Sequence, residues 1–146
     1  ELGGFAEVYP TDWLRVRGEV RQGIRSHDGI VAELSADAFM DIMPQAEGHA
    51  LVIPKQPATT LFELSDEAAG ACMATVRKVG QAMKTGLGAH GIVLMQLNGE
   101  AAGQTVPHFH IHVIPGSIAD LRRPHATQMA DMDHLKALAG KIAAAL

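Results

Sequence analysis

Three histidines alternate with apolar residues in the segment 108–113, which reads His-Phe-His-Ile-His-Val. On a β-strand, side chains at every second position share a face, so the three imidazoles would lie on one face and the apolar side chains on the other. Imidazole changes charge near neutral pH, can act as a nucleophile and binds metal ions. The spacing therefore predicts a reactive site along one strand.

Two kinds of chemistry fit such a strand. Some zinc enzymes hold their ion with a His-x-His pair on a strand, and three protein nitrogens with one water would make a catalytic metal centre. Alternatively, one imidazole attacks an electrophile and forms a covalent intermediate that water then resolves. Loss of activity with a chelator would favour the metal site.

Three blocks of the chain together resemble the histidine triad superfamily of nucleotide hydrolases and transferases. Residues 108–113 look like its His-x-His-x-His signature, and residues 39–55, Phe-Met-Asp-Ile-Met-Pro-Gln-Ala-Glu-Gly-His-Ala-Leu-Val-Ile-Pro-Lys, are similar to its first block. Residues 98–106, with Asn-Gly at the start and Gly-Gln-Thr-Val at the end, resemble the loop before the triad. The similarity covers about residues 30 to 114 in the right order, which is a specific combination.

The resemblance implies a hydrolase of the Hint- or Fhit-like branch that acts at the α-phosphorus of an adenosine nucleotide conjugate. The conjugate would be a phosphoramidate, an acyl-adenylate or a dinucleoside polyphosphate, and a nucleoside monophosphate would be released. By this resemblance His110 attacks phosphorus and forms a nucleotidyl-histidine. His112 would then hydrogen-bond the phosphate and assist the leaving group, His108 would orient its neighbours, and His49 would lie near the phosphate.

The same resemblance assigns the nucleoside to the first block. Asp41 would accept hydrogen bonds from the ribose hydroxyls, a task that suits a carboxylate. Phe39 and Ile42 would bracket the base. From the residues alone, Asp41 could instead cap a strand end, and the two apolar side chains could be core.

The loop before the triad would contact the phosphate. Gln104 and Thr105 would hydrogen-bond its oxygens, and donors aimed at developing charge contribute strongly to such reactions. Gly103 would permit a close approach of the backbone. Asn98 would add a polar contact, although an Asn-Gly pair is also an ordinary turn.

Two departures from the family pattern bear on metal and reaction type. Many members bind zinc through a Cys-x-x-Cys pair and a histidine soon after the Ile-Pro-Lys block; here Gln56 and Pro57 follow Lys55, and Cys72 is the single cysteine. We therefore expect no metal and no cofactor. His112 replaces the glutamine of the uridylyltransferase branch, which favours hydrolysis. A nucleotide-binding regulatory protein with slow turnover remains a further alternative, although the intact nucleophile argues against an inactive protein.

The composition is that of one ordinary domain. The chain has 146 residues, of which 47% are hydrophobic and 19% charged, with a formal charge of −4. No basic run is longer than the two residues of Arg122-Arg123, so we expect no nucleic-acid track. The apolar runs Ala50–Pro54 and Gly91–Leu97 are too short to cross a membrane. A single cysteine suits a reducing cytoplasm.

Apolar runs predict strands at Ile30–Leu34, Ala38–Ile42, His49–Pro54 and His108–Ile114, and a central strand at Ile92–Leu97. The first two would form a hairpin. A loop with Gly99 and Gly103 would lead into the histidine strand. Strands grouped around one long helix indicate an α+β domain with an antiparallel sheet.

Helical spacing predicts a weak helix at Asp12–Ile24 and a clear one from an N-cap at Ser65 to a stop at Gly86-Leu87-Gly88. The buried stripe of the long helix would comprise Ala69, Met73, Val76, Gly80, Met83 and Leu87. A carboxy-terminal helix would bury Leu135, Leu138, Ile142 and Leu146. We expect Cys72 to be a packing residue, and the histidines outside the motif to lie at the surface, namely His27, His90, His125 and His134.

Residues 1–146 would thus form one domain, with a core at about 30–114, an extension at 1–29 and a helical tail at 116–146. The resemblance also implies a homodimer. Its candidate interface is the long helix together with the strand Ile92–Leu97.

Overall fold

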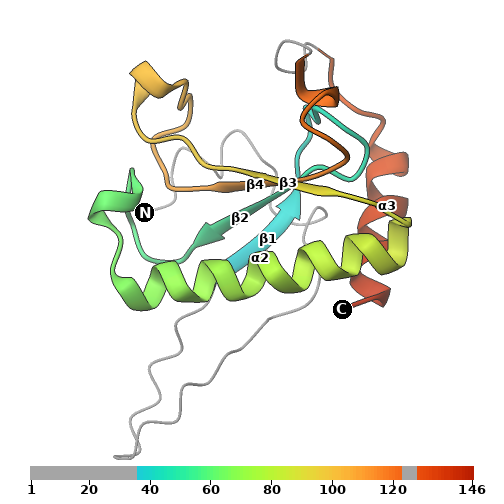
Figure 1. The fold of residues 1–146 in the computed structure, drawn as a ribbon, viewed down its shortest axis with the longest axis horizontal. Coiled ribbons are helices and arrows are strands. Elements are labelled where there is room, and N and C mark those ends of the chain that lie inside the picture. The colour runs from blue at the N-terminus through green and yellow to red at the C-terminus, as the bar shows by residue number, and fades with distance from the viewer. Residues whose placement is uncertain (1–35, 123–127) are drawn as a thin grey trace, which may run out of the picture.

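A computed structural model describes residues 36–122 and 128–146. Over these residues the sheet has four antiparallel strands in the order β1-β2-β4-β3, and α2 crosses one face of it while α3 stands beside α2 at one end (Figure 1). The strands are β1 Ala36–Met40, β2 Ala50–Pro54, β3 Ile92–Met95 and β4 Ile111–Pro115. The helices are α2 Asp66–Leu87 and α3 Met132–Ala144, with short 3-10 turns η1 Leu61–Glu63, η2 Glu100–Ala102 and η3 Asp120–Arg122. The predicted α+β fold with an antiparallel sheet is confirmed.

The hairpin in the structure joins β1 to β2. Ala36 pairs with Pro54 and Met40 with Ala50, so the loop 41–49 connects two strands in register. The sequence placed a hairpin one strand earlier, between 30–34 and 38–42. The residues 30–34 and the weak helix 12–24 lie outside the described residues.

Among the described strands, β3 lies at an edge of the sheet, so these residues do not supply the second neighbour that a central strand at Ile92–Leu97 requires. It pairs with β4 alone among the described strands and ends at Met95. Leu94 is 47% exposed. A continuous apolar run is typical of a strand covered on both sides, but the run itself does not show whether another strand of the same chain provides the cover.

The long helix α2 begins and ends where the sequence predicts. The Ser65 hydroxyl accepts a hydrogen bond from the Ala68 amide, and Gly88 closes the helix in the left-handed region with a φ of 68°. Its buried residues are Ala68, Cys72, Thr75, Val76, Val79, Gly80, Ala82 and Met83.

Part of the predicted stripe on α2 is wrong. Met73 is 51% exposed, and Ala69 and Leu87 are only half-buried. Because steps of three and four residues both fit a helix, a pattern rich in alanine is compatible with more than one face. The packing role predicted for Cys72 is confirmed, since it is fully buried, and this burial raises the pKa of its thiol to about 12.

The carboxy-terminal helix α3 packs against α2 and β1. Leu135, Leu138 and Ile142 are buried as predicted, whereas Leu146 lies beyond the helix end and is 47% exposed. The two helices approach closely at Gly86, where a Cβ atom would come within 2.6 Å of the Lys141 carbonyl oxygen.

The strand β4 keeps the predicted alternation. Phe109, Ile111 and Val113 belong to the core cluster that α2 covers, so His110 and His112 project toward the opposite side of the sheet. The ladder starts at Ile111, later than predicted, because the Phe109 amide donates to the Ala58 carbonyl rather than to a strand. No helix among the described residues is long and apolar enough to cross a membrane.

Candidate active site

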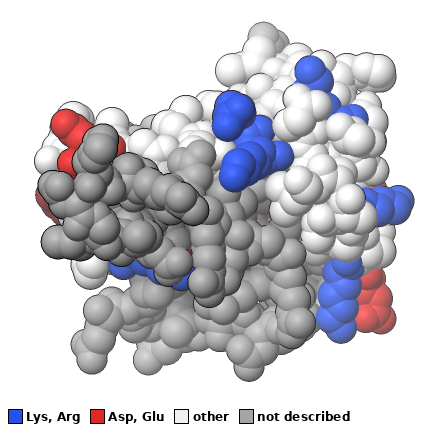
Figure 2. All heavy atoms as spheres, turned by 90° about the horizontal axis from the view of Figure 1, so that it is seen from below, with Lys and Arg blue, Asp and Glu red and all other residues white. Residues whose placement is uncertain are grey.

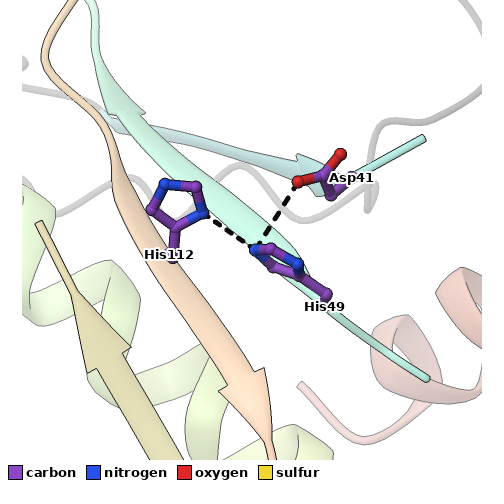
Figure 3. Close-up of side chains that lie close together, drawn as sticks. All are labelled: Asp41, His49 and His112. Carbon is purple, nitrogen blue, oxygen red and sulfur yellow. Dashed lines mark hydrogen bonds and ion pairs between the residues drawn. The ribbon is translucent and has the colours of Figure 1, made fainter. Parts of the chain in front are cut away.

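Two histidines and an aspartate from three elements meet at one end of the sheet. Asp41 directly follows β1, His49 directly precedes β2, and His112 lies in β4 beside Leu51 of β2 (Figure 3). All three side chains are buried. The β1–β2 hairpin brings Asp41 and His49 together, and the Asp41 amide donates to the His49 carbonyl at 2.9 Å.

His49 lies between the other two side chains (Figure 3). Its Nε2 is 2.9 Å from Nδ1 of His112 and 3.6 Å from Oδ2 of Asp41. The other carboxylate oxygen of Asp41 accepts a hydrogen bond from the Met43 amide at 2.8 Å. The imidazole pair is thus hydrogen-bonded within a buried group that holds one carboxylate.

His110 is held by its own backbone neighbour. Its Nδ1 lies 2.7 Å from the carbonyl oxygen of His108, and because a carbonyl oxygen only accepts, Nδ1 carries the hydrogen. In the neutral ring the lone pair is then on Nε2. The ring packs edge-on to His112, with 5.0 Å between the centroids.

His108 takes a different position from the other two triad histidines. Its Nε2 donates a hydrogen bond to the Pro54 carbonyl at the end of β2, at 3.2 Å. Burial lowers the pKa of His108 below its usual value of 6.5, although the bond to Pro54 acts in the other direction. The three histidines therefore differ in surroundings despite their regular spacing.

The loop before the triad is held together by Gln104. Its Oε1 accepts from the Gly99 amide at 2.7 Å, while its Nε2 donates to the carbonyls of Thr59 at 2.7 Å and Val106 at 3.0 Å. The side-chain amide therefore connects three backbone positions. Thr105 beside it is exposed.

Two other predicted residues of this loop shape its backbone. The Asn98 Oδ1 accepts from the Leu61 amide at 2.8 Å, which ties the loop to η1, and from the Gln96 side chain at 3.0 Å. Gly103 closes η2 with a φ of 95°, a conformation that glycine adopts without strain.

The predicted base-binding residues Phe39 and Ile42 are half-buried and pack against the core. The Ile42 carbonyl accepts from the Ala130 amide at 2.9 Å, which joins this end of the sheet to the segment before α3. Both side chains lie within two residues of Asp41 along the chain.

Sequence reasoning missed the support that backbone groups give to the site. The Gln45 amide donates to Nδ1 of His49 at 3.1 Å, and Oε1 of Gln56 accepts from the amide and hydroxyl of Ser65 at the start of α2. Gln45 lies in the motif block, but nothing in its side chain signals a role for its amide.

His90 and His134 are exposed as predicted, whereas His27 and His125 lie outside the described residues.

The buried group of Asp41, His49 and His112 contains side chains that can bind metal ions. Within residues 36–122 and 128–146, the group whose donor atoms lie close enough together is Asp41, His49 and His112, all within 4.8 Å of one another. It is not the set of three triad histidines that the metal alternative requires. His108 and His110 each direct a ring nitrogen to a backbone carbonyl instead.

The charges on the side of α2 do not form a continuous basic surface over the described residues. On the face seen in Figure 2, the Lys and Arg side chains of the described residues stand in separate groups.

Comparison with known proteins points to one family. The sequence model of the HIT domain matches residues 29–119. Adenosine 5'-monophosphoramidase hnt1 of Schizosaccharomyces pombe is 45% identical over 78 residues, which are 53% of this chain and 56% of that protein. The asymmetrical bis(5'-nucleosyl)-tetraphosphatase of the same organism is 39% identical over 88 residues, 60% of this chain and 48% of that one. The chain thus spans about half the length of these curated relatives.

Solved structures agree with the sequence comparison. A Hit-like protein from Bartonella henselae is 40% identical with a TM-score of 0.70, and the match covers 76% of this chain and 80% of that one. The two proteins therefore share a common fold over about three quarters of this chain.

Proposed function

The chain belongs to the HIT domain family, and from that premise we propose that it hydrolyses adenosine nucleotide conjugates at the α-phosphorus through a nucleotidyl-histidine intermediate. Phosphoramidates, acyl-adenylates and dinucleoside polyphosphates are the candidate substrates, and AMP is the product. The names of two relatives, a phosphoramidase and a tetraphosphatase, support this substrate class.

The proposal rests mainly on which nitrogen of the His110 ring carries the hydrogen. Because Nδ1 donates to the His108 carbonyl, the neutral ring has its nucleophilic lone pair on Nε2. A neutral imidazole is a competent nucleophile near pH 7. Nε2 would attack phosphorus, the bond to the leaving group would break, and water would then hydrolyse the phosphorus–nitrogen bond.

The remaining site residues take supporting roles in this proposal. His112 beside His110 would hydrogen-bond the phosphate oxygens and assist the leaving group, with His49 behind it. Asp41 would bind the ribose between Phe39 and Ile42. His108 would hold the backbone of the triad through Pro54.

The loop 98–106 would cover the phosphate side. Gly103 and the exposed Thr105 could reach a bound phosphate, while Asn98 and Gln104 keep the loop in place through the hydrogen bonds already described. The proposal includes neither metal nor cofactor in the reaction. It also assigns the protein to the cytoplasm, because a reducing compartment keeps a single thiol such as that of Cys72 reduced.

The test is AMP release from adenosine phosphoramidate and from diadenosine tetraphosphate, followed by chromatography. We expect His110→Ala to lose at least about 1,000-fold in kcat, as removal of a nucleophile does in other enzymes. His134→Ala is the matched control, because this histidine is exposed on α3, and it should retain wild-type activity.

The same assay separates the competing functions. Equal AMP release by wild type and His110→Ala would refute the nucleophile. Loss of wild-type activity on chelation would favour a metal enzyme, and tight nucleotide binding without AMP release by the wild type would favour a regulatory protein. The ratio of the two substrate rates would distinguish a phosphoramidase from a dinucleoside polyphosphate hydrolase.

The proposal also includes a homodimer through β3 and α2. An apolar groove of about 200 Å³ lies between them, lined by Leu61, Ala69, Met73, Leu94, Met95, Gln96, Phe109 and Ile111. Met73 and Leu94 are 51% and 47% exposed, and β3 has one paired neighbour among the described strands. A second copy presenting the same groove would cover these apolar side chains and the strand edge.

A further inference from the structure

We propose that the backbone amide of Gln45 fixes the tautomer of His49 and, through it, places the hydrogen of His112 on Nε2. Gln45 would then be a positioning residue whose contribution comes from the main chain. The catalytic meaning of this inference rests on the proposed function, whereas the tautomers themselves do not.

The first step is the contact between Gln45 and His49. The Gln45 amide lies 3.1 Å from Nδ1 of His49, and a backbone N–H only donates. Nδ1 must therefore accept, which puts the hydrogen of the neutral His49 ring on Nε2. His49 is 1% exposed, so the opposite tautomer would set two N–H groups against each other without water to relieve them.

The second step uses the hydrogen on Nε2 of His49 to determine which nitrogen of His112 carries a hydrogen. Nε2 of His49 lies 2.9 Å from Nδ1 of His112, so its hydrogen is donated to that nitrogen. Nδ1 of His112 then accepts, and the hydrogen of the neutral His112 ring is on Nε2. Oδ2 of Asp41, 3.6 Å from Nε2 of His49, is a carboxylate oxygen that favours a hydrogen at that position.

The loop between β1 and β2 holds all parts of this chain of hydrogen bonds. The Asp41 amide donates to the His49 carbonyl at 2.9 Å, and the His49 amide donates to the Ala46 carbonyl at 3.1 Å. The Met43 amide fixes the carboxylate of Asp41 at 2.8 Å. Gln45 therefore occupies a position that the loop determines on both sides.

A backbone acceptor and a backbone donor consequently give the neighbouring imidazoles of His110 and His112 different hydrogen-bonding roles at Nε2. The His108 carbonyl accepts from Nδ1 of His110 and leaves the lone pair on Nε2. The Gln45 amide acts through His49 and leaves a hydrogen on Nε2 of His112. One Nε2 can attack phosphorus and the other can donate to a phosphate oxygen or the leaving group.

The donation from the Gln45 amide to Nδ1 of His49 also bears on metal binding. A histidine that binds a metal through Nε2 usually donates its Nδ1 hydrogen to an acceptor. Here the Gln45 amide faces Nδ1 of His49 as a donor, so a metal on Nε2 would require that hydrogen bond to break. The buried group is therefore arranged for a hydrogen between His49 and His112.

Two-bond ¹H–¹⁵N correlation spectra of the nucleotide-free wild-type protein test the inference directly. We expect both His49 and His112 to carry hydrogen on Nε2 and His110 on Nδ1. A hydrogen on Nδ1 of His49 or His112 would overturn it. This measurement uses the unaltered chain and does not depend on any hydrolysis.

Substitutions at position 45 test the role of the amide. Gln45→Pro removes the N–H, whereas Gln45→Ala keeps it and removes a side-chain Oε1 that is buried without a hydrogen-bond partner in the described structure. Gln45→Ala should keep the wild-type tautomers and kcat. Gln45→Pro should show a mixture of His49 tautomers and a kcat lower by about tenfold to a hundredfold, with a much smaller change in KM. This loss is smaller than the roughly 10²–10⁴-fold contribution of a proton donor, because part of the population would keep the correct tautomer.

Unchanged tautomers in a folded Gln45→Pro protein would refute the role of the amide. If that variant does not fold, the wild-type spectrum still decides which nitrogen carries the hydrogen. The His110→Ala comparison tests the proposed function separately, so correct tautomers in a protein that releases no AMP would count against the function and not against the tautomers.

Discussion

At the scale of single residues, identical side chains gain different properties from the backbone groups that they face. His108 donates to the Pro54 carbonyl, His110 donates to the His108 carbonyl, and His112 is hydrogen-bonded to His49. The spacing of the sequence predicts that the rings of His110 and His112 share a face, and it does so because alternation is a local property of an extended chain. It cannot predict their hydrogen-bond partners, since His110 contacts the His108 carbonyl of its own segment while His112 contacts His49 from the loop before β2.

His108 should make stability depend on pH. Burial lowers its pKa in the folded protein, so the unfolded chain takes up a proton first as the pH falls below about 6.5. The free energy of unfolding should therefore decrease between pH 7 and pH 5, and this loss is complete only once the folded protein also binds the proton. Thermal melts at pH 7, 6 and 5 measure the effect.

His108→Gln provides the comparison, because glutamine does not titrate and its side-chain amide can still donate to the Pro54 carbonyl. Its Tm should fall less over the same pH range than that of the wild type. Parallel pH curves for the two proteins would contradict a shifted pKa at this position.

At the scale of elements, the closest approach between the two helices depends on a residue without a side chain. A Cβ at Gly86 would lie 2.6 Å from the Lys141 carbonyl oxygen and 3.1 Å from its carbonyl carbon. Backbone atoms of α3 cannot rotate away as a side chain can. We expect Gly86→Ala to lower the free energy of unfolding by about 1–3 kcal/mol, the usual effect of overpacking.

Gly70→Ala is the matched control for this prediction. Gly70 lies on the same helix with nothing within 4 Å of the added Cβ, so alanine should stabilise the helix by about 0.5–1 kcal/mol. Urea unfolding of both variants gives the two values. A Gly86→Ala protein as stable as Gly70→Ala would mean that the helices separate without cost.

The elements themselves differ in how far the sequence predicts them. Both ends of α2 follow from local signals, the N-cap Ser65 and the left-handed Gly88. The face that α2 buries and the edge position of β3 depend on which segments pack beside them. Met73 and Leu94 are exposed for that reason, although each is as apolar as a core residue.

At the scale of the whole molecule, the exposed apolar side chains of Leu61, Met73 and Leu94 line the groove between α2 and β3, and the proposed dimer would cover them. Leu94→Asp should shift the protein toward monomer, because a carboxylate in a paired apolar groove would lose its water. Sedimentation or light scattering should give twice the mass of one chain for the wild type and close to one chain for the variant. A wild type that is monomeric at every concentration would exclude the dimer.

Met129→Asp controls for the general effect of a new surface charge. Met129 is 68% exposed and precedes the amide of Ala130 that hydrogen-bonds beyond β1, at the other side of the sheet from β3. This variant should remain dimeric. The family resemblance predicted the dimer and its candidate elements, but residue types alone do not show whether an apolar surface is paired.

The alternation along β4 makes correct folding and chemistry inseparable. Phe109, Ile111 and Val113 contribute to the core, while the residues between them form the site. A shift of this strand by one residue against β2 would exchange the two sets, so imidazoles would enter the apolar core and aromatic and branched side chains would leave it. Such a misregistered molecule would lose stability and activity together. Packing of the alternate apolar residues in the core therefore also fixes the side of the sheet on which the histidines lie.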